Sequence, residues 1–198
     1  MTVAALYVLP DGPYAGLEGV EVWDEARDAR TYAGPWPVVA HPPCARWCRL
    51  AGLVEARWGH KRGGDGGCFR SCLAAVRRWG GVLEHPAYSD AFRAHGLPHP
   101  PRQGGWQMSL CGGAVCHVEQ SKYGHRAKKA TWLYAHSIEL PALRWGASLD
   151  SASDALVSWC GNHTQAHGTR PRLGKRDAKS TPPAFRDLLI SMARSARP

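Results

Sequence analysis

The sequence contains no apolar run of about eighteen residues, and therefore no predicted membrane-spanning helix. Its first residues carry no basic leader and enter an apolar strand pattern at once, which predicts mature structure rather than a signal peptide. Internal repeats and low-complexity segments are absent as well. What is left is the length of one moderate domain, with room for at most a small appendage.

Acidic residues are fewer than basic residues in this sequence. The 198 residues hold 25 Lys and Arg against 16 Asp and Glu, a formal net charge of +9. With nine tryptophans spread among the cations, this composition favours a partner that carries phosphates and stackable bases. A basic protein with no nucleic-acid role is the alternative.

The number of cysteines indicates whether the thiols are reduced or form disulfides. Seven cysteines are an odd number in a chain without a secretion signal. This pattern favours reduced thiols in a cytoplasmic setting over a disulfide framework.

One stretch joins a predicted strand to a cysteine through a stiff turn. Val38 to Ala40 is a short apolar run bounded by proline, which predicts a buried strand. His41-Pro42-Pro43 ends it, because proline lacks a backbone donor and holds the preceding residue extended. Cys44 is then the first residue free to turn into a helix-like stretch, where the helix dipole and backbone donors favour the thiolate. A half-buried structural cysteine is the alternative.

Other predicted strands also end on polar residues. Val3 to Leu9 leads into a loop rich in turn formers, Gly19 to Asp24 ends on an acidic residue, and proline stops Val82 to Pro86. Two more strands are expected at Ala114 to Gln120 and Ala130 to His136. Strands that each open into a loop at the carboxyl end predict an α/β fold with its ligand site along that edge.

Helical periodicity is clearest between Cys68 and Trp79, with apolar residues on one face and Gly80-Gly81 at the end. Cys44 to Trp58 is expected to be helical in part, and Ala87 to His95 helical. A last helix follows Thr181 as its cap and Pro182 in its first turn. We therefore expect a single α/β domain over 1–198, a mainly parallel sheet flanked by helices, with an irregular segment at about 146–176.

Three motifs occur in an order that suggests a family. They are His41-Pro42-Pro43-Cys44, Glu84-His85-Pro86, and the basic segment Tyr123 to Lys129. This order resembles that of the DNA cytosine carbon-5 methyltransferases, most closely the short methyltransferase-like proteins common in phage genomes. The resemblance implies a Rossmann-like class I methyltransferase fold, S-adenosylmethionine as donor, DNA as partner, and a bacterial or phage-infected cell.

The chemistry of that family gives the order a reason. Carbon-5 of cytosine becomes nucleophilic only after a thiolate adds to carbon-6, the role the resemblance gives to Cys44. A carboxyl group at the N3 edge shares a proton during the addition, which suits Glu84. A cation steadies the charge that develops near the carbon-2 carbonyl, which suits Arg126.

The segments expected to bind the cofactor depart from the family pattern. Its Phe-x-Gly-x-Gly turn after the first strand is absent, and Asp11 and Gly12 stand in a different loop. Asp24, at the end of the second strand, is a candidate ribose-binding acid. The resemblance adds Pro42 and Pro183 from the neighbouring motifs to this candidate cofactor edge.

Two basic segments are expected to hold the phosphates around a flipped base of a DNA duplex. The first is the glycine-rich loop from Gly59 to Gly67, with Lys61 and Arg62. The second is the connection from Ser121 to Lys129, and its candidate contacts are Lys122, His125, Lys128 and Lys129.

Two alternative functions and one alternative site stay open at this point. The first function is that of a non-catalytic nucleic-acid-binding protein on a diverged methyltransferase fold, and the second is that of a pyrimidine-modifying enzyme that acts on nucleotides. The cysteine pairs Cys44/Cys48 and Cys68/Cys72 suggest a zinc site only weakly, because structural zinc pairs usually have two intervening residues. We expect no metal site.

Overall fold

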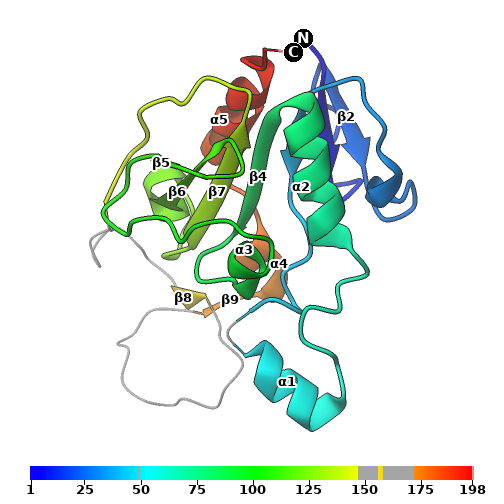
Figure 1. Ribbon diagram of the computed structural model, residues 1–198, viewed down its shortest axis with the longest axis vertical. Helices are drawn as coiled ribbons and strands as arrows, with labels where there is room; N and C mark the ends of the chain where they lie inside the picture. The colour runs from blue at the N-terminus through cyan, green and yellow to red at the C-terminus, as the bar shows by residue number, and fades with distance from the viewer. Residues whose placement is uncertain (49, 147–155, 158–171, 198) are drawn as a thin grey trace.

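The computed structural model describes residues 1–48, 50–146, 156–157 and 172–197. Its centre is a seven-stranded sheet in the order β2-β1-β3-β4-β7-β6-β5 (Figure 1). The strands are β1 (Val3–Leu6), β2 (Val20–Trp23), β3 (Val38–Ala40), β4 (Gly81–Pro86), β5 (Gln107–Met108), β6 (Ala114–Glu119) and β7 (Ala130–His136).

Helices connect and flank these strands. The helical elements are η1 (Ala29–Thr31), α1 (Ala51–Trp58), α2 (Cys68–Trp79), α3 (Asp90–Ala94), η2 (Gln120–Tyr123), α4 (Lys175–Lys179) and α5 (Pro183–Arg194). The chain ends lie close together, and Arg194 Nε donates to the Met1 carbonyl over 3.2 Å (Figure 1).

The sheet is mixed. β1 pairs in parallel with β2 and β3, and β3 with β4, whereas β7 is antiparallel to both β4 and β6. The short edge strand β5 is antiparallel to β6. The α/β class is thus confirmed, but the expected parallel pairing holds only from β2 to β4. Because β7 is antiparallel to both neighbours, β4 and β6 run in the same direction, but β7 lies between them and they do not pair.

Two apolar layers cover the sheet because successive strand residues face opposite sides. On one face Phe69, Cys72 and Val76 of α2 pack with residues such as Leu83. On the other face Phe185 and other apolar residues of α5 pack with residues such as Val82. The helix predicted over Cys68 to Trp79 is confirmed with both bounds, and Figure 1 shows α2 and α5 on opposite sides of the sheet.

Several predicted bounds need correction. Residues 45–47 form turns, and α1 begins only at Ala51, so Cys44 does not open a helix. The helix expected from Ala87 is the shorter α3, capped by the Ser89 hydroxyl. Thr181 makes no cap: α5 begins at Pro183, and Pro182 in the N-cap position has no side-chain hydrogen bond.

The segment expected to be irregular, at about 146–176, is described only in part. Within it, β8 (Leu156–Val157) and β9 (Arg172–Leu173) pair in parallel as a two-stranded sheet. Residues 147–155 and 158–171 lie outside the described residues, and with them most of this prediction. In the described parts of the chain, no helix is long and apolar enough to cross a membrane.

Candidate active site

Polar side chains gather at the edge of the sheet where β1, β3 and β4 end. His41 directly follows β3, and Glu84 lies near the end of β4. Both fall on the sheet face that α5 covers, because each follows Val39 or Val82 by two residues. The strand ends therefore place a histidine and a carboxylate side by side on one face.

Glu84 receives hydrogen bonds at both carboxylate oxygens. His41 Nδ1 lies 2.9 Å from Oε2, and Gln120 Nε2 lies 3.0 Å from Oε1. Burial raises the pKa of Glu84, but the His41 hydrogen bond and the Lys129 charge outweigh burial and lower the pKa to about 2. Glu84 is therefore ionised at neutral pH although it is only 7% exposed.

Tyr14 holds the far side of the His41 ring. Its hydroxyl lies 2.8 Å from His41 Nε2, and the two ring centroids are 5.3 Å apart. Burial raises the pKa of Tyr14, and the Glu84 carboxylate raises it further, so the phenol keeps its proton. When Tyr14 donates to Nε2, the proton of a neutral His41 is on Nδ1 and faces Glu84.

Gln120 extends these contacts across the sheet to β7. Its Nε2 also donates to Thr131 Oγ1 over 2.9 Å, and Thr131 Oγ1 donates to the Lys129 carbonyl over 3.2 Å. The result is a buried polar chain in the order Tyr14, His41, Glu84, Gln120 and Thr131. We call it the Glu84 chain; it fixes both oxygens of the carboxylate.

Lys129 is the cation beside this chain. Its Nζ donates to the backbone carbonyls of Lys179 (3.1 Å) and Ser180 (2.9 Å), just before α5. Burial lowers the pKa of Lys129, while the Glu84 carboxylate and the Cys44 thiol both raise it. The Lys129 ammonium therefore interacts electrostatically with both groups, although its sequence context predicts a phosphate contact.

Cys44 is half-buried at the same edge. Burial raises the pKa of its thiol, the Glu84 carboxylate raises it further, and the Lys179 ammonium lowers it. The expectation of a thiolate favoured by a helix start is therefore wrong: turns follow Cys44, and its surroundings favour the protonated thiol. Its nearness to Glu84 is what the motif order predicts.

Arg126, the predicted substrate clamp, is exposed on the connection between η2 and β7. Three residues later, Lys129 lies beside Glu84 and Cys44 instead. The structure therefore brings together Cys44 and Glu84 of the three predicted catalytic residues, with a different cation.

His85, the middle residue of the Glu84-His85-Pro86 motif, faces away from this site. Its ring packs edge-on against Phe69 of α2, with ring centroids 5.2 Å apart. Burial lowers the pKa of His85 to about 4, against the opposing effect of the Glu84 carboxylate. His85 is a neutral core residue at physiological pH.

The residues predicted to bind S-adenosylmethionine are engaged elsewhere or lie apart. Asp24 Oδ1 accepts from the Arg27 backbone N–H over 3.0 Å, and Asp11 forms an exposed ion pair with Arg176 at 3.1 Å. Gly12 lies in a turn closed by its own N–H to the Leu9 carbonyl. Pro42 is buried, and Pro183 is exposed in the first turn of α5.

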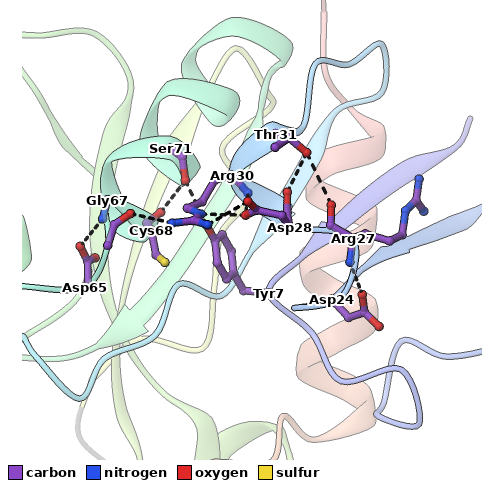
Figure 2. A network of polar contacts seen from close by, with 11 residues as sticks. Tyr7, Asp24, Arg27, Asp28, Arg30, Thr31, Asp65, Gly67, Cys68 and Ser71 are labelled. Atoms are coloured by element: carbon purple, nitrogen blue, oxygen red, sulfur yellow. Dashed lines mark hydrogen bonds and ion pairs between the residues drawn. The ribbon is translucent and has the colours of Figure 1, made fainter.

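Side chains also fill the end of β1. The Tyr7 hydroxyl lies 3.1 Å from the Ser71 hydroxyl of α2, next to Arg30 paired with Asp28 (Figure 2). On the other face, Tyr14 is buried against His41. Among the described residues, those present at this edge do not form a cradle for S-adenosylmethionine.

The residues predicted to contact DNA have mixed surroundings. Lys61 and Lys128 are exposed, whereas His125 is buried with Nδ1 2.8 Å from the Ala127 carbonyl. Arg62 Nε donates to Asp90 over 3.0 Å, and Lys122 Nζ donates to the Trp145 carbonyl. They do not all face solvent, and His125 and Lys129 in particular are turned inward.

The cysteine pairs do not form a metal centre in the described part of the chain. Cys72 is buried in the core beneath α2. Among the described residues, no group of three or more His, Cys, Asp or Glu side chains is placed to hold a metal ion.

Sequence reasoning assigns no role to four members of the Glu84 chain. His41 and Thr131 carried a detectable signal, because each lies two residues from a core position on a strand and so faces α5. Tyr14 and Gln120 carried none: a loop and a 3-10 turn bring them to the site. No protein-family model matches this chain, and no curated protein is similar enough to count as a relative.

Proposed function

We propose that this protein is an enzyme that activates a pyrimidine base of DNA at carbon-5 by adding the Cys44 thiol to carbon-6. The observation that carries the proposal is that Cys44 follows β3, Glu84 lies near the end of the adjacent strand β4, and Lys129 directly precedes β7, whose first residues pair with the end of β4. These are the three kinds of group that the addition requires: a nucleophile, a proton carrier and a cation.

The resting thiol is protonated, so its proton must leave as the sulfur–carbon bond forms. The neighbouring Glu84 carboxylate accepts that proton and passes it to N3 of the ring. The carbon-5–carbon-6 double bond opens, and its electrons move toward N3 to leave a neutral enamine. All atoms of the thiol and the base are retained, and carbon-5 is now the nucleophile.

Lys129 is the cation that stabilises charge during this addition. Two backbone carbonyls hold its ammonium group, so the cation is fixed before the substrate arrives. A preorganised charge in a partly buried site stabilises a developing anion better than a mobile one in water. We assign to Lys129 the clamp role that the family pattern suggested for Arg126.

His41 and Gln120 are positioning residues. Each holds one oxygen of Glu84, and Tyr14 fixes the tautomer of His41. This arrangement keeps Glu84 ionised, so the carboxylate relays the thiol proton to N3 and does not retain it.

S-adenosylmethionine, when bound, would supply the methyl group that carbon-5 attacks. Since the described residues at the ends of β1 and β2 form no cradle for it, the proposal covers addition and activation at carbon-5 only. A non-catalytic nucleic-acid-binding protein on the same fold is the second candidate. The raised pKa of Cys44 and the filled β1 edge favour it.

Hydrogen exchange at carbon-5 tests the addition without any donor. The enamine takes a solvent proton at carbon-5, so an active enzyme in deuterium oxide labels cytosine there, and mass spectrometry measures the label. We expect Cys44→Ser to abolish exchange and Lys129→Met to slow it about 100- to 1,000-fold. The matched variant Arg126→Met keeps the rate.

The substrate form is tested in the same assay with duplex DNA, single-stranded DNA and deoxycytidine monophosphate. Exchange that is faster in DNA supports the proposal, and exchange in the nucleotide alone moves the activity to nucleotides. Absence of exchange in every substrate, together with tight DNA binding, would establish the non-catalytic candidate. Trapping on 5-fluorocytosine DNA with and without S-adenosylmethionine then tests the donor.

A further inference from the structure

A second polar group lies at the same edge of the sheet, on the face opposite Cys44. Glu84 and His85 are neighbours on β4 and therefore point to opposite faces, and the loop after β4 continues on the His85 side. There, aromatic, cationic and acidic side chains meet. We call this group the Tyr88 platform: Tyr88, His99, Arg102, His117, Glu119 and Trp132.

Tyr88 is the exposed surface of the platform. The residue is 37% exposed, and its ring packs at an angle against Trp132 and His117, with ring centroids 5.5 and 6.1 Å away. The Arg102 guanidinium lies 5.8 Å from the Tyr88 ring centroid. The Tyr88 backbone has a φ of 63°, in the left-handed region that a tyrosine rarely adopts. Such strained residues cluster at binding and catalytic sites.

A buried carboxylate lies below this surface. Trp132 Nε1 donates to His117 Nδ1 over 3.2 Å, and His117 Nε2 lies 3.7 Å from Glu119 Oε1. The other oxygen, Glu119 Oε2, is buried and has no hydrogen-bond partner among the described residues. An unpaired buried acceptor is costly, so a ligand that brings an N–H donor to it gains affinity.

We infer that the Tyr88 platform binds an unpaired nucleobase with an exocyclic amino group, in a single-stranded segment of nucleic acid. The base stacks on the Tyr88 ring, the Glu119 side chain turns outward so that Oε2 accepts from the amino group, and Arg102 contacts the neighbouring phosphate. An exposed aromatic ring beside a guanidinium is the arrangement that binds single strands through stacking and charge. This site is separate from the proposed Cys44 chemistry and does not depend on it.

Fluorescence anisotropy with short labelled oligomers of deoxyadenosine and of deoxynebularine at one fixed salt concentration tests the inference. Both bases stack, but the unsubstituted purine of nebularine has no amino group and no N–H on its pairing edge, and neither base is a substrate for Cys44 addition. We expect the native protein to bind the adenine strand more tightly. Tyr88→Ala should weaken binding of both strands roughly 5- to 150-fold, and Tyr88→Phe should leave it unchanged.

Two further variants separate the polar contacts. Glu119→Gln should remove the preference for adenine over unsubstituted purine while keeping most of the affinity. Arg102→Gln should reduce the slope of log affinity against log salt by about one unit. Arg93→Gln is its matched control, since Arg93 is an exposed cation of α3 outside the platform. Melting temperatures of all variants verify that they fold.

Native affinity in Tyr88→Ala, equal binding of the two strands by the native protein, or no binding of either strand would each overturn the inference. Carbon-5 exchange in deoxycytidine monophosphate depends on Cys44 and not on Tyr88. A failure of the Cys44 chemistry and a failure of this platform therefore appear in different assays.

Discussion

The ionised state of Glu84 makes the stability of this protein depend on pH in a definite window. The ordinary pKa of the carboxyl is 4.5, and His41 and Lys129 lower it to about 2 against the opposing effect of burial. Folding therefore favours the carboxylate. This contribution to stability is fully present above pH 4.5 and is lost as the pH falls toward 2.

The size of the effect follows from the shift. A pKa unit corresponds to about 1.4 kcal/mol, so the lowered pKa corresponds to about 3 kcal/mol of the free energy of unfolding. Glu84 is buried, and solvent screening therefore does not reduce this figure much. We expect Glu84→Gln to be less stable than the native protein by up to about 3 kcal/mol at pH 7 and equally stable near pH 2.

Urea unfolding at a series of pH values between 7 and 2, followed by circular dichroism, measures the difference. Other carboxyl groups titrate in the same range, so the quantity to plot is the stability of the native protein minus that of the variant. Glu55→Gln is the matched control, because Glu55 is exposed on α1. Parallel curves for the native protein and Glu84→Gln would refute the account of the Glu84 chain.

Two other perturbations test the core around the site. Burial lowers the pKa of His85 from 6.5 to about 4, so the neutral ring contributes stability above pH 6.5 that is lost as the pH falls to 4, about 3 kcal/mol in all. His85→Phe should remove that dependence in urea titrations between pH 7 and 4, and an unchanged slope would contradict it. Gly81→Ala should cost more than about 4 kcal/mol in the same assay, because an added Cβ would lie 2.0 Å from the Val38 carbonyl oxygen at a φ of +128°. Gly52→Ala, in open space on α1, should instead stabilise by about 0.5–1 kcal/mol, and equal effects of the two would show that β3 and β4 tolerate the extra atom.

Local pattern predicted the elements that bury a continuous face. The helix over Cys68 to Trp79 was predicted with both bounds, since its apolar spacing and terminal glycines are encoded within the segment itself. The strand Ala130 to His136 was predicted with both bounds for the same reason. The helix start at Cys44 failed, because no apolar face begins there and α1 is exposed over most of its length.

Motif order likewise indicated that Cys44 and Glu84 lie together. Cys44 comes shortly after one predicted strand and Glu84 lies near the end of another, and the ends of neighbouring parallel strands meet at one edge. The choice of cation could not be made this way. Arg126 and Lys129 lie in one basic segment of similar composition, and only the path of the chain from η2 into β7 turns Lys129 inward.

By itself, the sequence determined the α/β class, the bounds of α2 and β7, and the nearness of Cys44 to Glu84, because these depend on periodicity and on strand ends. Tertiary structure alone decided that β7 lies antiparallel between β4 and β6. It also decided that Tyr14 and Gln120 complete the Glu84 chain, from positions 27 residues before His41 and 36 residues after Glu84. Pairings over such separations depend on how whole elements pack, and no local pattern of residues encodes them.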